Sequence, residues 1–223
     1  MPDPILSPIE ARVLGVLVEK QRTVPDTYPM SLNAIVGGCS QKTSRDPLMS
    51  VTDAEAQAAI DSLKSVSLVV ETSGGRVMRY AHNTERALGL PAQSVALLAV
   101  LMLRGPQTAG ELRINCDRLH RFADISAVEG FLQELATRSA GALAVELPRT
   151  PGTRETRWAH LLSGTPAIET APAGFAAGPP PAASELSLLR DTVAALQDEV
   201  AALKSALAQL RTDLGVSPPT DAP

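Results

Sequence analysis

The sequence predicts a mainly α-helical fold with small β-hairpins (an α+β fold), in which one structural unit is used twice and a different tail follows. Two four-residue strings carry this prediction, because Arg79–His82 (Arg-Tyr-Ala-His) and Arg157–His160 (Arg-Trp-Ala-His) are near copies. Upstream segments match in the same order: Val13–Leu17 with Leu97–Leu101, Pro29–Cys39 with Pro106–Cys116, and Ile60–Leu63 with Leu132–Leu135. Two copies separated by insertions indicate two related domains and not a solenoid.

Each copy is expected to consist of three helices followed by a hairpin. In the first copy, the helices begin at side chains that can cap them, and apolar residues then recur at helical spacing; the caps are Ser7 (with Pro8 and Glu10 in the first turn), Ser31 and Asp53. Gly37-Gly38 is expected to end the second helix. Strands over 67–72 and 76–82 flank a glycine-rich turn.

The second copy repeats this order of elements. The expected helices cover 95–103, the segment from the Thr108 cap to Cys116, and 126–138, and the hairpin strands cover 142–147 and 155–162. Three helices and a hairpin in this order form a winged helix, a variant of the helix-turn-helix. The sequence therefore predicts tandem winged-helix domains over residues 5–86 and 90–163.

A Pro/Ala/Gly-rich linker over 164–184 leads to a predicted coiled-coil helix over 185–214, and 215–223 is expected to be a disordered tail. Apolar residues fill every a and d position and are the candidate dimerisation residues: Leu186, Leu189, Val193, Leu196, Val200, Leu203, Leu207, Leu210 and Leu214. In a parallel pair, Glu185 faces Arg190 and Glu199 faces Lys204, which favours a homodimer. The alternative is a single amphipathic helix that folds back on the two domains.

The composition favours a soluble cytoplasmic protein that does not enter a membrane. The net charge is −4, so the sum of charges gives no sign of a nucleic-acid-binding protein. No secretory signal precedes the first helix, and the longest apolar stretch, Val95–Leu103, is too short to cross a bilayer. Cys39 and Cys116 occupy equivalent repeat positions and are expected to be free, buried thiols in a reducing compartment.

Several longer strings resemble the YceH-like proteins, a bacterial family with no established molecular function. They are Glu10–Gly15, Pro25–Pro29, Gln41-Lys42, Arg45–Pro47, Leu103–Thr108, Gly110–Arg113 and Leu147–Arg149. The resemblance covers most of residues 5–163 and implies tandem winged-helix domains. Ser40 stands where an asparagine is expected before Gln41. The resemblance implies no substrate, cofactor or partner.

Charge on the third helices argues against reading of DNA in the major groove. In both copies the third helix carries more carboxylates than cations. DNA has one negative charge per ~1.7 Å of its axis, so these carboxylates would repel it. The basic residues lie on the hairpins and on the loops after the second helices. The candidate nucleic-acid-binding residues are Lys42, Arg45, Arg76, Arg79, Arg113, Arg118, Arg154 and Arg157. The sequence thus favours a dimeric DNA-binding regulator that contacts the phosphate backbone; the alternative is an adaptor whose winged helices bind protein.

No residue pattern predicts catalysis, a metal or a cofactor, and the chain is expected not to be an enzyme. The glycine pairs belong to a helix end and a turn, and no nucleophile, base and acid share a recognisable spacing. His82 and His160 are too isolated to bind zinc, which takes about four ligands. Tyr80 and Trp158 could stack on bases, but the more frequent role of such aromatics is to pack on their own helices.

Overall fold

The computed structural model describes residues 4–72, 77–149 and 155–165. Within them the chain has a mixed α/β fold of seven α-helices and two small antiparallel sheets. These residues all belong to one unit, Met1–Ile168. The predicted linker, coiled coil and C-terminal tail lie outside the described residues, apart from the first two positions of the linker.

The order of elements in the first copy follows the prediction. The elements are α1 (Pro8–Thr23), a 3-10 turn (Pro25–Thr27), β1 (Met30–Ser31), α2 (Leu32–Cys39), α3 (Asp53–Ser65), β2 (Val69–Thr72) and β3 (Arg79–His82). The predicted cap of α1 is confirmed: the Glu10 amide donates to Ser7 Oγ at 3.3 Å, and the Ser7 amide donates to Glu10 Oε2 at 2.6 Å. Ser31 caps α2, also as predicted. The amides of Ser7 and Glu10 are thereby satisfied, and Pro8 has no N–H that needs a partner.

The second copy contains the same elements except for the 3-10 turn and a strand equivalent to β1. They are α5 (Ala92–Arg104), α6 (Ala109–Asn115), α7 (Ile125–Thr137), β4 (Ala144–Leu147) and β5 (Arg157–His160). Thr108 caps α6, as predicted, with Glu111 completing a capping box. A short helix that the sequence pattern did not reveal, α4 (Thr84–Leu88), joins the copies, and Gly89, whose φ is +63°, caps its C-terminus.

Hydrogen-bond register shows that the two copies are equivalent. In the first sheet, Tyr80 pairs with Met30 of β1. In the second copy an isolated bridge replaces that strand, and Gln107 and Trp158 exchange two backbone hydrogen bonds of 3.0 and 2.7 Å. The two aromatic residues are 5% and 6% exposed, so both point inward, as the sequence analysis favoured.

Three expected boundaries are corrected by the structure. Gly37 and Gly38 lie within α2, which ends at Cys39. A Cβ on Gly38 would lie 2.6 Å from Val16 Cγ1, so this glycine lets α2 approach α1 closely and does not end the helix. The cap of α3 is Thr52 and not Asp53, because Thr52 Oγ1 accepts from the Glu55 amide at 3.3 Å. The hairpin strands are also shorter than expected.

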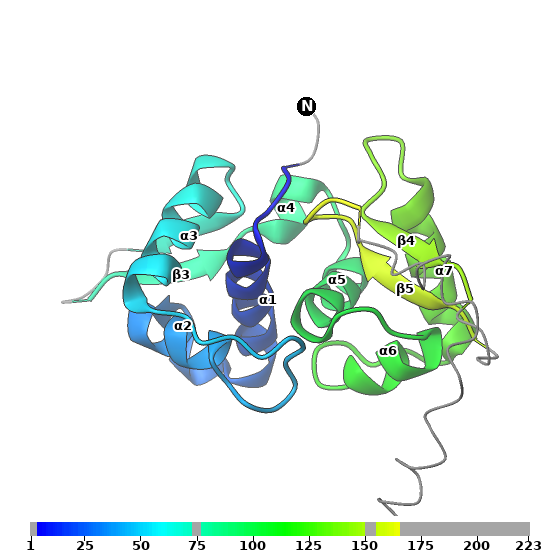
Figure 1. Cartoon of the computed structure of the whole chain (residues 1–223), viewed down its shortest axis with the longest axis horizontal. Helices are drawn as coiled ribbons and strands as arrows, with labels where there is room; N and C mark the ends of the chain where they lie inside the picture. Colours follow the sequence, from blue (N-terminus) through cyan, green and yellow to red (C-terminus); the bar gives the residue numbers. More distant parts are fainter. Residues whose placement is uncertain (1–3, 73–76, 150–154, 166–223) are drawn as a thin grey trace, which may run out of the picture. The chain divides into compact units, whose positions relative to one another are not determined.

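The two copies meet along their first helices and share one apolar core (Figure 1). A Cβ on Gly15 of α1 would lie 3.0 Å from Leu103 Cγ and 3.4 Å from the Ala99 carbonyl oxygen of α5. Gly15 and Ala99 hold equivalent positions in the repeat, so the helices pack through corresponding faces, as in a two-fold interface. Leu14 and Leu98 are fully buried there, and each such side chain contributes about 1.5–3 kcal/mol.

Candidate nucleic-acid interface

Arg45 is buried and is withdrawn from the candidate contacts. It is 6% exposed, and its guanidinium donates to both carboxylate oxygens of Glu19, at 2.6 and 3.2 Å. Its other hydrogen bonds go to the carbonyl oxygens of Gly38 and Ser44. A side chain with all these partners inside the fold cannot reach a phosphate without breaking an internal ion pair.

The two equivalent hairpin arginines are exposed but engaged at the edge of their own copies. Arg79 donates to the Pro29 carbonyl oxygen at 2.8 Å. Arg157 lies 3.5 Å from Glu111 at the start of α6, and both of these side chains are about half exposed. The exposed pair of Arg157 with Glu111 contributes little energy, so Arg157 can exchange Glu111 for another anion.

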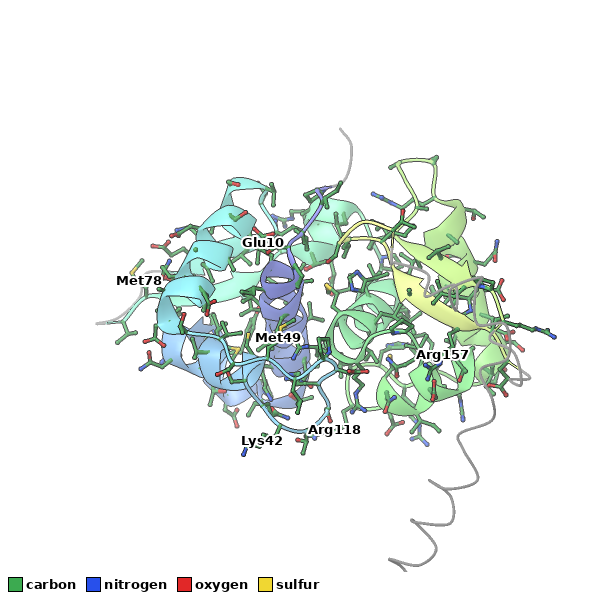
Figure 2. All side chains as sticks on the ribbon, in the orientation of Figure 1. Glu10, Lys42, Met49, Met78, Arg118 and Arg157 are labelled. Atoms are coloured by element: carbon green, nitrogen blue, oxygen red, sulfur yellow. The ribbon has the colours of Figure 1, made fainter. Side chains whose placement is uncertain are left out.

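Three further candidates project from loops or helix ends. Lys42 and Arg118 lie on the lower edge of the view in Figure 2 and pair with no carboxylate of the described residues. Arg113 donates to the Ala123 carbonyl oxygen at 3.2 Å. Nearby, Arg121 lies 3.9 Å from Asp117. Arg76 and Arg154, like the nine heptad residues, lie outside the described residues.

The outward faces of the third helices are acidic. In α3, Asp53, Glu55 and Asp61 are exposed. Its one cation, Lys64, pairs with Glu71 and lies 3.8 Å from Asp61. In α7 there is no lysine or arginine at all, while Glu129 and Glu134 are exposed. The helix that would enter a major groove therefore brings only negative charge in the second copy.

Buried polar residues of the repeat serve the fold. Burial lowers the pKa of His82 and of His160 from 6.5 to about 4, with Arg22 adding to the effect at His82. Both imidazoles are therefore neutral near pH 7. Burial also raises the pKa of Cys39 to about 11 and that of Cys116 to about 12, so these free thiols are unreactive, buried residues, as expected.

A groove of about 600 Å³ lies between α6, α7 and the second hairpin. We call it the α7 groove. Its lining residues are Ala109, Gly110, Ile125, Glu129, Gly130, Gln133, Glu146, Arg149, Glu155, Thr156 and Trp158. The sequence pattern revealed the charge of Glu129 but not this groove. No local sequence pattern relates its lining residues, which come from α6, α7 and the hairpin.

No metal cluster and no membrane-crossing helix occurs in the part of the chain that the structure describes. Among those residues, no three His, Cys, Asp or Glu side chains gather closely enough to hold a metal ion. None of the described helices is both long and apolar enough to span a bilayer.

A family model described as "Protein of unknown function, DUF480" matches residues 6–153, which include most of both copies. The chain belongs to this family. It is 66% identical over 171 residues to a UPF0502 protein of Dechloromonas aromatica, covering 77% of this chain and 80% of the relative. It is also 60% identical over 188 residues to a UPF0502 protein of Leptothrix cholodnii, covering 83% of this chain and 84% of that relative.

In this DUF480 chain, several of the strings that resemble YceH-like proteins build the seam between the copies. The Asp46 amide donates to the Leu103 carbonyl oxygen at 2.8 Å, and Arg104 donates to Ser44 Oγ at 2.8 Å. Arg12, which is 1% exposed, donates to the carbonyl oxygen of Pro47 at 2.7 Å. These strings therefore hold the loop after α2 against α1 and α5, which is a structural role.

Proposed function

We propose that this DUF480 protein is a non-enzymatic adaptor that binds another protein through winged-helix domains. Two features support winged helices: the order helix, helix, helix, hairpin occurs twice, and the third helix packs beside its hairpin in each copy. The two free, buried thiols support action in the reducing cytoplasm.

One observation favours a protein partner over DNA. The α7 helix, which lies where a winged helix would read DNA, has no lysine or arginine and exposes Glu129 and Glu134. Placing these carboxylates beside phosphates would cost electrostatic energy, because like charges repel and no cation of α7 offsets them. The same face suits a protein partner that carries cations.

A second candidate function is contact with the DNA backbone. It is favoured by Lys42 and Arg118, whose side chains are exposed and pair with no carboxylate in the described ranges, and by the exposed Arg113. Contacts of this kind hold a protein on phosphates without reading sequence. They would be made by the α2–α3 loop, the end of α6 and the α6–α7 loop, and not by the third helices.

A duplex titration decides between the two functions. The full chain and a Lys42→Glu/Arg118→Glu variant are titrated with a labelled duplex of random sequence, at salt from about 50 to about 200 mM. The adaptor function predicts no saturable binding at the lowest salt. Binding that weakens as salt rises, and that the double variant loses while an Arg86→Glu control keeps it, would establish the second function instead.

We also propose that the chain is a homodimer held by the heptads of residues 185–214. Aspartates at two d positions, Leu196→Asp and Leu203→Asp, would place charges in the seam, whereas Ala195→Asp and Ala202→Asp would place the same charges outside it. Light scattering on full chains should give a dimer mass for the native chain and the control, and a monomer mass for the seam variant. Equal masses for all three would exclude this dimer.

A further inference from the structure

The α7 groove differs from the rest of the acidic surface because it combines charge with an open apolar floor. Its walls come from separate elements: α7 on one side, the β4–β5 hairpin on the other, and the start of α6 at the end. Side chains from three elements therefore converge on one space of about 600 Å³, which matches the volume range of ligand pockets.

The charge of the described groove residues favours a cationic occupant. Three glutamates line it, Glu129, Glu146 and Glu155, against one arginine, Arg149. Glu146 Oε1 accepts a 2.5 Å hydrogen bond from Thr156 Oγ1, which holds that carboxylate against the hairpin. The Glu129 carboxylate makes no hydrogen bond or ion pair with any described residue. Charge interactions strengthen in a recess because solvent screens them less than on an open surface.

The floor of the groove can take an apolar side chain. Ile125, which lines the groove, is 46% exposed, and Trp158, which also lines it, is 6% exposed. A Cβ added to Gly130, in the middle of α7, would meet no atom within 4 Å. The fold does not require glycine there, and glycine costs a helix about 1 kcal/mol relative to alanine. Its effect is to leave the helix backbone open to close approach by a partner.

We propose that the α7 groove binds a basic segment of a partner protein, with one apolar side chain over Ile125 and Gly130 and its Lys or Arg side chains against Glu129 and Glu146. This assignment rests on the adaptor function proposed above and names the chemistry of its partner. Nucleic acid does not fit the same space, because its phosphates would face the glutamates. An apolar anchor in a recess with charged pairs around it is the usual arrangement of a strong protein contact.

The probe is a random dodecapeptide phage library, selected against the immobilised full-length protein. Selected peptides should be rich in Lys and Arg and contain an apolar residue. Tryptophan-free synthetic copies can then be titrated while the emission of Trp158 is followed, because Trp158 is the only tryptophan of the chain. Binding should change this emission, since Trp158 is one of the residues that line the groove.

Two variants test the location. Gly130→Leu fills the groove, and Glu129→Lys reverses a wall charge; each should weaken peptide binding at least about tenfold, equivalent to about 1.4 kcal/mol. Glu134→Lys makes the same charge change on α7 outside the lining residues, and it should change affinity less than about threefold. Thermal melts of the variants confirm that each is folded.

The outcomes separate this inference from the adaptor function. Basic peptides that bind Gly130→Leu and Glu129→Lys as tightly as the native chain would refute the groove and leave an adaptor with another site. Selected peptides that are acidic, or that resemble the Pro/Ala-rich segment of this chain, would refute the basic partner. Failure to enrich any peptide, together with salt-sensitive duplex binding, would refute the adaptor function itself.

Discussion

Replacing Glu19 by glutamine should destabilise the protein by about 3 kcal/mol. The change keeps the size of the side chain but removes the carboxylate that accepts two hydrogen bonds from Arg45, whose side chain is fully buried. A buried arginine without its counterion typically costs 3–5 kcal/mol, and we take the lower end because Glu19 is 15% exposed. Urea unfolding followed by circular dichroism measures the loss.

The control is Glu85→Gln, which breaks the pair between Arg22 and Glu85. Both of these side chains are 45% exposed, so the loss should stay below about 1 kcal/mol. Equal losses for Glu19→Gln and Glu85→Gln would contradict a structural role for Arg45. This result would also make Arg45 a candidate nucleic-acid contact again.

The Glu19 pair also has a pH dependence with a defined sign. Burial pushes the pKa of Glu19 upward, but the hydrogen bonds and charges of Arg45 and then Lys20 together outweigh burial and leave that pKa lowered. A carboxylate with a lowered folded pKa stabilises the fold above its unfolded pKa of 4.5. This contribution is lost as pH falls through the folded pKa, and Glu19→Gln should lack it.

Acidification from pH 7 to pH 5 should destabilise the protein by about 2 kcal/mol for each of the buried histidines His82 and His160. Their folded pKa is about 4, whereas the unfolded value is 6.5. Below pH 6.5 these histidines are therefore protonated in the unfolded chain but not in the folded chain. The free energy of unfolding falls with pH until the pH reaches about 4. Urea unfolding at pH 7, 6 and 5 measures this slope.

The structure explains why both imidazoles resist protonation. His82 Nε2 lies 2.7 Å from Gln21 Oε1. Its Nδ1 accepts a hydrogen bond from the Thr84 amide at 3.4 Å, and this hydrogen bond would be lost if Nδ1 were protonated. Nδ1 of His160 is buried and has no hydrogen-bond partner among the residues that the structure describes. A His82→Gln/His160→Leu variant should lose most of the slope between pH 7 and pH 5. An unchanged slope would show that other groups cause the acid sensitivity.

The sequence allowed prediction of the elements because their signals are local. A cap such as Ser7 with Glu10, or Thr108 with Glu111, acts within one helical turn, and the apolar periodicity of α1 and α5 is set by neighbours four residues away. Where local signals compete, the prediction failed: Gly38 looks like a helix terminator in sequence but serves the contact between α2 and Val16.

The candidate interface was less predictable, because exposure depends on residues far away in the chain. Arg45 looks like any other loop arginine until the fold brings Glu19, 26 positions earlier, against it. The groove arises in the same way: Gly130 lies on α7, and Glu146 and Trp158 lie on different strands of the hairpin. No local pattern relates these three positions, so only their packing makes them a single surface.

By itself, the sequence determined that this protein is one unit used twice, with three helices and a hairpin in each copy. Duplication and helical periodicity are patterns of residues near one another in the sequence, so they can be recognised without the fold. Only the tertiary structure decided that the copies share one core through α1 and α5, and which charges face solvent. The physical reason is that burial and ion pairing are long-range properties: Arg45 became part of the interior and the glutamates of the α7 groove became a surface once the helices had packed.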